Sequence, residues 1–315
     1  RYTDDEMPGE GYAVAFLRSP HAHAVLTSLD ISAAATAPRV IMAASHADMA
    51  ADNVGEIHCQ QYVDNSDGTA VPRTTKPAMI ADIVRYAGDI AAMVVAETRQ
   101  QAMDAIELIE ADYDSMPAVC DVYAALEDGA PQLYDCYPNN VVFDWASGDL
   151  DGARAGIAAA KADGHKIIEV DIVNSRLLAS ALETRPIVAQ PDGESLTLWL
   201  PSQGPAPLAS QIAEALGMKD DELKVLTGHV GGGFGYKIFL HPEQLCVAWA
   251  ARKIGSVVRW QQERSEAFLS DVHGRDNRTK AWAAVDKTGK ILAMEVSVHA
   301  NMGAWLSNFG IYIPT

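Results

Sequence analysis

The amino-acid sequence predicts an α+β or mixed α/β protein of two domains. Short strand-like segments and amphipathic helical segments alternate along its 315 residues, and glycine-containing turns join several strand pairs. Residues 126–164 are rich in turn-forming residues and hold only one weakly helical segment. We therefore expect one domain over residues 1–125, a connector over residues 126–164 and a second domain over residues 165–315.

The first domain is expected to mix strands with a helix. The segment GYAVAFL at residues 11–17 and the apolar run AAMVVA at residues 91–96 have the length and composition of strands. Alanine and isoleucine then recur at spacings of three and four between residues 102 and 109. This spacing predicts an amphipathic helix over about residues 98–110.

The second domain is expected to contain two β-hairpins, preceded by a strand at residues 166–174. Residues 187–190 and 195–200 are strand-like and flank a Pro-Asp-Gly turn. Residues 280–286 and 291–299 flank a Lys-Thr-Gly turn in the same way. Glycine in each turn permits the backbone reversal that an antiparallel hairpin requires.

Two helices are expected between these hairpins. Leucine and isoleucine lie four residues apart from residue 208 to residue 216, and Gly217 is placed to end that helix. A second helix begins at Pro242, a residue favoured at the first helical position, and ends at Gly255. Short strands are expected at residues 224–227 and 257–261.

The charge balance argues against two classes of partner. With 24 basic and 42 acidic residues, the chain carries a net charge of −18, which repels nucleic acid and anionic membranes. No apolar run approaches the roughly 20 residues that cross a bilayer. The opening RYTDDEMPGEGY lacks the apolar core of a signal peptide. We expect a cytoplasmic protein, or one whose true N-terminus lies upstream.

The four cysteines, Cys59, Cys120, Cys136 and Cys246, are widely spaced. None forms the C-x-x-C spacing that iron–sulfur clusters and zinc knuckles use, so neither kind of centre is expected in this chain. Scattered cysteines in a chain of this length are typical of reduced thiols rather than of a disulfide framework.

A glycine run is the strongest candidate for a binding loop. Gly231-Gly232-Gly233-Phe234-Gly235 follows a short expected strand, and the missing Cβ atoms allow backbone N–H groups to approach a ligand closely. The run lacks the Lys-Ser/Thr of a Walker phosphate loop, and Tyr236 departs from the dinucleotide-binding G-x-G-x-x-G pattern. A flexible or tightly turned loop without a ligand is the alternative.

Gln203 is the second candidate. It follows the strand-like residues 195–200 and directly precedes a predicted helix. Its amide can donate a hydrogen bond to an oxyanion or to a metal-oxo group. Taken alone, Gln203 is better interpreted as a solvated loop amide.

Several motifs together resemble the large subunit of the molybdenum hydroxylases, the family of xanthine dehydrogenase, aldehyde oxidase and carbon monoxide dehydrogenase. RSPHAHA at residues 18–24 resembles the start of the family's a/b hammerhead domain. GD and VVAET between residues 88 and 98, followed by DY at residues 112–113, resemble a later pattern of that domain. Residues 202–234 resemble the molybdopterin-binding domain, and ANMGAW at residues 300–305 resembles one of its strand ends.

The resemblance extends over essentially all 315 residues and implies a fold. A hammerhead domain would be followed by the first part of a molybdopterin-binding domain. It also implies a molybdenum ion held by a pterin, as molybdopterin or its cytosine dinucleotide. Gln203 would hydrogen-bond an oxo ligand, and the backbone of Gly232, Gly233, Phe234 and Gly235 would pack against the cofactor. No side chain of this chain would ligate the metal directly.

Other positions limit what the resemblance implies. His21 and His23 match only the hammerhead motif, so we expect a structural loop there and no metal ligation. Purine-hydroxylating members carry a glutamate where this chain has Ile238, which makes xanthine an unsuitable substrate. The family's general-base glutamate lies in several hundred residues that follow the part matched here. We therefore expect no catalytic residue within this chain and no oxidase activity from it alone.

The function implied is hydroxylation or oxidation of a small aldehyde, N-heterocycle or similar molecule. Electrons would pass to an iron–sulfur subunit, with FAD on a further subunit and the remaining molybdopterin-domain polypeptide as a partner, in a dimer of heteromers. The alternative is a non-catalytic binding or assembly subunit of the same fold, which the molybdenum and cytidine nucleotide content of the purified complex would distinguish. A phosphate-binding transferase is disfavoured by the missing Walker lysine.

Overall fold

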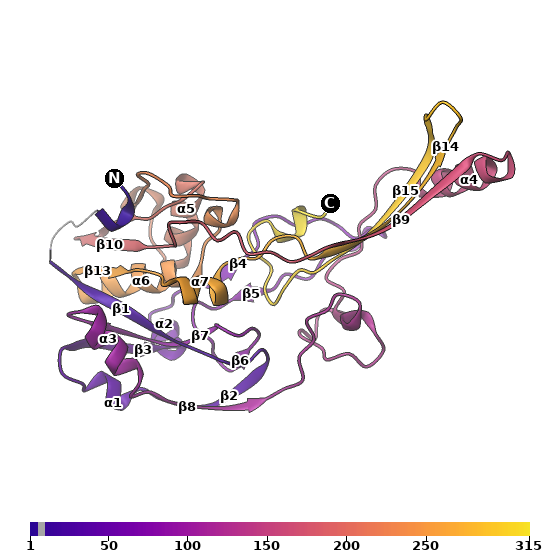
Figure 1. Ribbon diagram of the computed structural model, residues 1–315. Coiled ribbons are helices and arrows are strands. Elements are labelled where there is room, and N and C mark those ends of the chain that lie inside the picture. The colour runs from indigo at the N-terminus through magenta and orange to yellow at the C-terminus, as the bar shows by residue number, and fades with distance from the viewer. Residues whose placement is uncertain (6–9) are drawn as a thin grey trace. The chain divides into compact units, whose positions relative to one another are not determined.

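The computed structural model describes residues 1–5 and 10–315, which group into two compact units (Figure 1). Residues 6–9, part of the acidic opening segment, lie outside the described residues. Each unit is assembled from separate stretches of the chain. The first unit comprises Arg1–Cys59, Thr74–Ala118 and Leu178–Val272, and the second comprises Gln60–Arg73, Val119–Leu177 and His273–Thr315.

A mixed seven-stranded sheet, in the order β12-β11-β10-β13-β1-β7-β3, forms the centre of the first unit. Neighbouring strands pair antiparallel, except that β1 runs parallel to β13 and β11 runs parallel to β12. Strands from both predicted domains thus share one sheet. The strands are β12 (Leu223–Leu226), β11 (Ser195–Trp199), β10 (Ile187–Asp192), β13 (Val257–Trp260), β1 (Gly11–Arg18), β7 (Ile90–Ala96) and β3 (Val40–Ser45).

Helices cover both faces of this sheet, which explains the continuous apolar run in β7. Met93 and Val95 join the large core cluster that includes helix α6 (Pro242–Ile254). Val94 and Ala96 point to the other face, where they pack with helix α3 (Arg99–Ile106). A strand buried on both faces has no polar side to alternate with.

Smaller elements complete the first unit. Helix α5 connects β11 to β12, and α7 follows β13. A second sheet has the order β6-β2-β8, and β4 pairs with β5. These elements are α1 (Ser32–Ala35), α2 (His46–Ala51), α5 (Pro205–Ala215), α7 (Arg264–Ser270), β2 (Ala24–Asp30), β4 (Ile57–His58), β5 (Thr75–Lys76), β6 (Ile83–Val84) and β8 (Glu110–Ser115).

The second unit is built around the antiparallel sheet β15-β14-β9, formed by Ile291–Ala300, Asn277–Val285 and Lys166–Asn174. Helix α4 (Leu150–Ala162) packs on one face, as Figure 1 shows, and there Ala284 is fully buried. The opposite face is apolar and exposed. It carries Ile168, Val170, Ile172, Met294, Val296 and Val298.

The mixed α/β class and most predicted elements are confirmed. The strand at residues 166–174, both hairpins, and the helices that begin at Pro205 and Pro242 are present, with ends shifted by at most a few residues. Gly193, Gly217 and Gly255 adopt positive φ angles at the expected turns and helix ends.

The helix predicted over residues 98–110 was too long. The helix α3 ends at Ile106, and the strand β8 begins at Glu110. Ile109 packs against the same apolar cluster as α3. It therefore fits the helical spacing of apolar residues although it lies after the helix. Pairing of β8 with β2 determines where the helix stops. Strands β2, β3 and β8 and helix α7 were not predicted.

Residues 126–164, the predicted connector, contain one short 3₁₀ turn, at Pro138–Asn140, as well as α4. The domain boundaries predicted from the sequence stay a prediction. Among the described residues, no helix is both long and apolar enough to cross a membrane.

Candidate functional site

Two loops meet where β11 and β12 end. Because these neighbouring strands run parallel, their carboxyl ends lie at the same end of the sheet. The hydroxyl of Thr227 donates to the carbonyl oxygen of Leu200 over 2.9 Å, which joins the two strand ends. The loop that carries Gln203 therefore lies beside the loop that carries the glycine run.

Gln203 is tied to the glycine run by its side chain. The backbone N–H of Gly235 donates to Gln203 Oε1 over 2.9 Å, and the backbone N–H of Gln203 donates to the carbonyl oxygen of Lys237 over 3.1 Å. Within the described residues the Gln203 NH₂ group has no hydrogen-bond partner, and the side chain is exposed. An amide held by its oxygen presents two N–H donors to a ligand.

The glycine run has an unusual backbone. The φ angles of Gly232, Phe234 and Gly235 are +101°, +48° and +90°. For phenylalanine this left-handed conformation costs about 1–2 kcal/mol, and its ring is 73% exposed rather than packed in a core. Strained backbone of this kind is concentrated at functional sites.

Contacts within the chain explain why two positions of the run require glycine. A Cβ atom on Gly233 would lie 2.5 Å from Cδ of Gln203, and one on Gly231 would lie 2.5 Å from Cβ of Glu183. A Cβ atom on Gly235 would meet nothing within 4 Å, so only its φ angle favours glycine there. The side chains of Glu183 and Gln203 occupy the space beside Gly231 and Gly233.

A buried ion pair that was not predicted from the sequence lies behind the run. Lys237 Nζ donates to Glu183 Oε2 over 3.0 Å and to the Glu183 carbonyl oxygen over 2.8 Å. The side chains of Lys237 and Glu183 are only 0% and 9% exposed. The sequence feature that could have indicated this pair is the presence of charged residues in the otherwise apolar stretch at residues 181–189.

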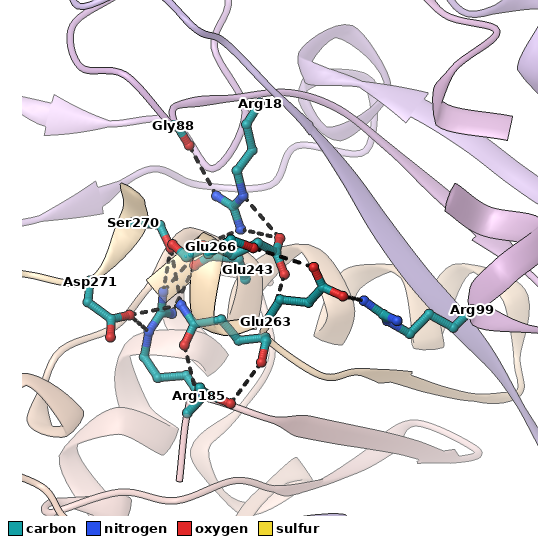
Figure 2. Close-up of polar contacts among 12 residues, drawn as sticks. Arg18, Gly88, Arg99, Arg185, Glu243, Glu263, Glu266, Ser270 and Asp271 are labelled. Atoms are coloured by element: carbon teal, nitrogen blue, oxygen red, sulfur yellow. Dashed lines mark hydrogen bonds and ion pairs between the residues drawn. The ribbon is translucent and has the colours of Figure 1, made fainter. Parts of the chain in front are cut away.

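Two residues after Glu183, Arg185 belongs to a buried ionic network (Figure 2). Its guanidinium donates to Asp271 over 2.6 Å and to Glu243 over 3.0 Å, and Glu243 also binds Arg18 over 2.9 Å. Burial alone would raise the pKa of Glu243, but Arg185 and Arg18 outweigh it and hold that pKa well below its usual range. Arg18 of the RSPHAHA motif thus helps to neutralise the buried Glu243 carboxylate.

The other residues singled out in the sequence, His21, His23 and Ile238, contact neighbouring residues of the protein. His23 is buried, and its Nδ1 lies 2.9 Å from the carbonyl oxygen of Pro117. The Nδ1 atom of His21 lies 3.1 Å from the hydroxyl of Ser115. Ile238 faces Gly204, where an added Cβ atom would lie 3.2 Å from Ile238 Cγ1.

Comparison with protein families gives two matches. Residues 1–117 match the "Aldehyde oxidase and xanthine dehydrogenase, a/b hammerhead domain", and residues 133–315 match the "Molybdopterin cofactor-binding domain". The carbon monoxide dehydrogenase large chain of Afipia carboxidovorans is 32% identical over 96% of this chain. The nicotine 6-hydroxylase large subunit of Paenarthrobacter nicotinovorans is 27% identical over 97% of it.

Solved structures give the same result. Quinoline 2-oxidoreductase from Pseudomonas putida is 32% identical with a TM-score of 0.82, and carbon monoxide dehydrogenase from Oligotropha carboxidovorans is 28% identical with a TM-score of 0.85. Each alignment covers 95% of this chain and 37% of the other chain. The chain likewise spans 38% and 36% of the two sequence relatives. The chain therefore belongs to the molybdenum hydroxylase large-subunit family, as a hammerhead domain followed by part of a molybdopterin cofactor-binding domain.

Proposed function

We propose that Gln203 and the glycine run bind a molybdenum–molybdopterin cofactor, in an oxidoreductase that hydroxylates or oxidises a small molecule. The observation that carries this proposal is the hydrogen bond from Gly235 N–H to Gln203 Oε1, which leaves the Gln203 NH₂ group as a donor at the ends of two parallel strands. The names of the relatives, which refer to carbon monoxide, nicotine and quinoline, support a small substrate.

The donors at this site fit an oxygen-rich cofactor. Besides the Gln203 amide, the backbone N–H groups of Gly232, Gly233 and Phe234 donate to no atom of the described residues. Consecutive unpaired N–H groups in a glycine loop suit oxo or phosphate oxygens. When bound, the cofactor supplies the redox chemistry, and these residues bind and orient it. The form of the pterin, with or without a cytosine nucleotide, belongs to the same proposal.

Ile238 limits the substrates that we propose. Its side chain is apolar and packs toward Gly204, so it cannot hydrogen-bond a purine ring as a glutamate would. An aldehyde, a simpler N-heterocycle or a molecule of similar size fits this position better than xanthine.

The chain is proposed to act with partners. The general-base glutamate would come from the part of the large subunit that relatives have in addition to the region matched here. Electrons would leave through an iron–sulfur subunit and an FAD subunit, in a dimer of heteromers located in the cytoplasm. The non-catalytic alternative predicts a purified complex without molybdenum.

Two substitutions of Gln203 test the proposal in the complete enzyme. Gln203→Glu keeps an oxygen that can accept from Gly235 N–H but removes the NH₂ donor, whereas Gln203→Ala removes both. A hydrogen bond lost from such a site costs about 1–3 kcal/mol, so we expect kcat to fall by about 5- to 150-fold in both variants. Gln100→Ala, in an exposed glutamine of α3, is the matched control. Unchanged kcat and molybdenum content in both Gln203 variants would contradict the proposal.

A further inference from the structure

We propose that Glu183 and Lys237 are positioning residues, whose buried ion pair holds the glycine run in the conformation that presents Gln203 and the free backbone N–H groups to the cofactor. The inference rests on the proposed function of the glycine run. It assigns a role to two residues that themselves face the protein interior.

The pair contacts both ends of the run. At its start, Gly231 N–H donates to Glu183 Oε2 over 2.8 Å, and the Gly231 carbonyl oxygen accepts from Glu183 N–H over 3.2 Å. After its end, the Lys237 ammonium donates to Glu183, while the Lys237 carbonyl oxygen accepts from Gln203 N–H over 3.1 Å. One residue thus fixes the start of the run, and the other connects its end to Gln203.

The Glu183 carboxylate depends on Lys237 for its counter-charge. Glu183 Oε2 receives both side-chain hydrogen bonds, and Glu183 Oε1 is buried with no hydrogen-bond partner in the described chain. Lys237 therefore supplies the only counter-charge within salt-bridge distance of that carboxylate among the described residues. Removing one member of such a buried pair leaves an uncompensated charge, which is more disruptive than removing both.

The segment on which Glu183 lies is itself held rigidly. Arg264 Nη2 donates to the carbonyl oxygens of Ala181 and Leu182 over 2.6 and 3.0 Å. The Thr184 hydroxyl donates to the Gln262 carbonyl oxygen over 2.8 Å. Arg185, the next residue, enters the ionic network of Figure 2. Glu183 is a fixed anchor, so loosening the pair should release the glycine run rather than the anchor.

The first test measures amide hydrogen exchange in the complete enzyme, purified without cofactor from a host that cannot synthesise molybdopterin. In Lys237→Met, we expect the Gly231 amide to exchange about tenfold faster, equivalent to about 1.4 kcal/mol in the opening equilibrium. In the double variant Glu183→Gln/Lys237→Met, exchange should return toward the wild-type rate, because the new amide oxygen can accept from Gly231 without a buried charge.

The matched control is the exposed pair Lys219–Glu222, whose side chains are 80% and 28% exposed. Lys219→Met should leave exchange of the glycine run unchanged. Exchange in β7 reports whether each variant is folded. Wild-type exchange at Gly231 in folded Lys237→Met would overturn the inference, and so would a double variant that is no better protected than the single one.

The second test uses the loaded enzyme. Glu183→Gln should lower molybdenum content and broaden the Mo(V) electron paramagnetic resonance signal, because the orientation of Gln203 becomes variable; Lys219→Met should keep both at wild-type values. Gly233→Val separates the two proposals. If it retains full molybdenum content, the proposed cofactor loop fails; if it loses molybdenum while the Glu183 and Lys237 variants behave as wild type, only the positioning role fails.

Discussion

Gly233 illustrates how a single Cβ atom decides the conformation of a neighbouring residue. Its missing side chain leaves the space that the Gln203 amide occupies, with Cδ only 2.5 Å from where a Cβ atom would be. The Gln203 oxygen then accepts from Gly235 N–H. The two candidate motifs are therefore in direct contact, because a side chain at position 233 would displace the Gln203 amide.

Gly233→Val should displace Gln203 and release the cofactor without unfolding the protein, since the loop joins elements that pack elsewhere. We expect most of the molybdenum to be lost while the far-ultraviolet circular dichroism spectrum stays unchanged. Gly274→Val is the control, because a Cβ atom there would meet only Leu177 Cδ1, at 3.8 Å. Full molybdenum occupancy in Gly233→Val would contradict the assignment of the loop.

His241 should make the stability of the first unit depend on pH. Its Nε2–H donates to the Tyr236 carbonyl oxygen, and burial together with Arg185 lowers its pKa to about 4. The folded protein thus keeps His241 neutral while the unfolded chain binds a proton below about pH 6.5, so stability falls as the pH falls from 6.5 to 4. The full loss is about 3 kcal/mol, at 1.36 kcal/mol per pH unit.

The measurement for His241 is urea unfolding between pH 7 and pH 4 in wild type, His241→Gln and the exposed control His229→Gln. The pKa of Glu243 lies well below its usual range, so Glu243 stays ionised through most of this window. We expect His241→Gln to be less stable at pH 7 but to lose less stability on acidification. An identical pH dependence in wild type and His241→Gln would refute the assignment.

At the scale of elements, the sheet β15-β14-β9 has two faces of different character. Pairing aligns Ile168, Val170, Met294 and Val296 on one face, where each is 39–54% exposed. The opposite face is covered by α4, and Ala284 there is fully buried. Side chains along each strand alternate between the face that α4 covers and the uncovered face, which carries the apolar residues. Substitutions on the two faces should therefore differ in their effect on stability.

Val296→Lys should leave the fold of the 315-residue chain stable within about 0.5 kcal/mol and should reduce its self-association and its binding of the dye ANS. Ala284→Lys should unfold the second unit, because a lysine there would be buried under α4 without a partner. Analytical ultracentrifugation and circular dichroism measure the two outcomes. Equal destabilisation by both substitutions would show that the Val296 face is buried in solution.

At the scale of the whole molecule, the chain holds two units with separate cores. The large cluster under the seven-stranded sheet belongs to the first unit, and a smaller cluster around Val71, Tyr137 and Ile311 belongs to the second. Because each core is formed within one unit, each unit should unfold as its own cooperative transition.

Glu243→Gln tests this independence. The substitution leaves the buried guanidiniums of Arg185 and Arg18 short of a counter-charge, and breaking a buried pair costs about 3–5 kcal/mol. Calorimetry should show one transition shifted to lower temperature and the other unchanged. Glu97→Gln, in an exposed pair with Arg39, should change stability by about 1 kcal/mol or less. A single transition that shifts as a whole would rule out independent units.

Local features of the sequence were enough to predict most elements and both candidate loops. Glycines at turns and helix ends, proline at first helical positions and the spacing of apolar residues act over a few neighbouring residues, so they can be read without a fold. The motifs that resemble the molybdenum hydroxylases identified the family for the same reason, because they are short and contiguous.

Only the tertiary structure revealed the Glu183–Lys237 pair, whose members lie 54 positions apart, and the Arg18–Glu243 contact across 225 positions. The helix α3 ends at Ile106 because the following strand, β8, pairs with β2. Strands from both predicted domains pair in one seven-stranded sheet. These outcomes depend on which strands pair and which charges are buried together. Such contacts form between distant segments, and no local pattern in a single sequence specifies them.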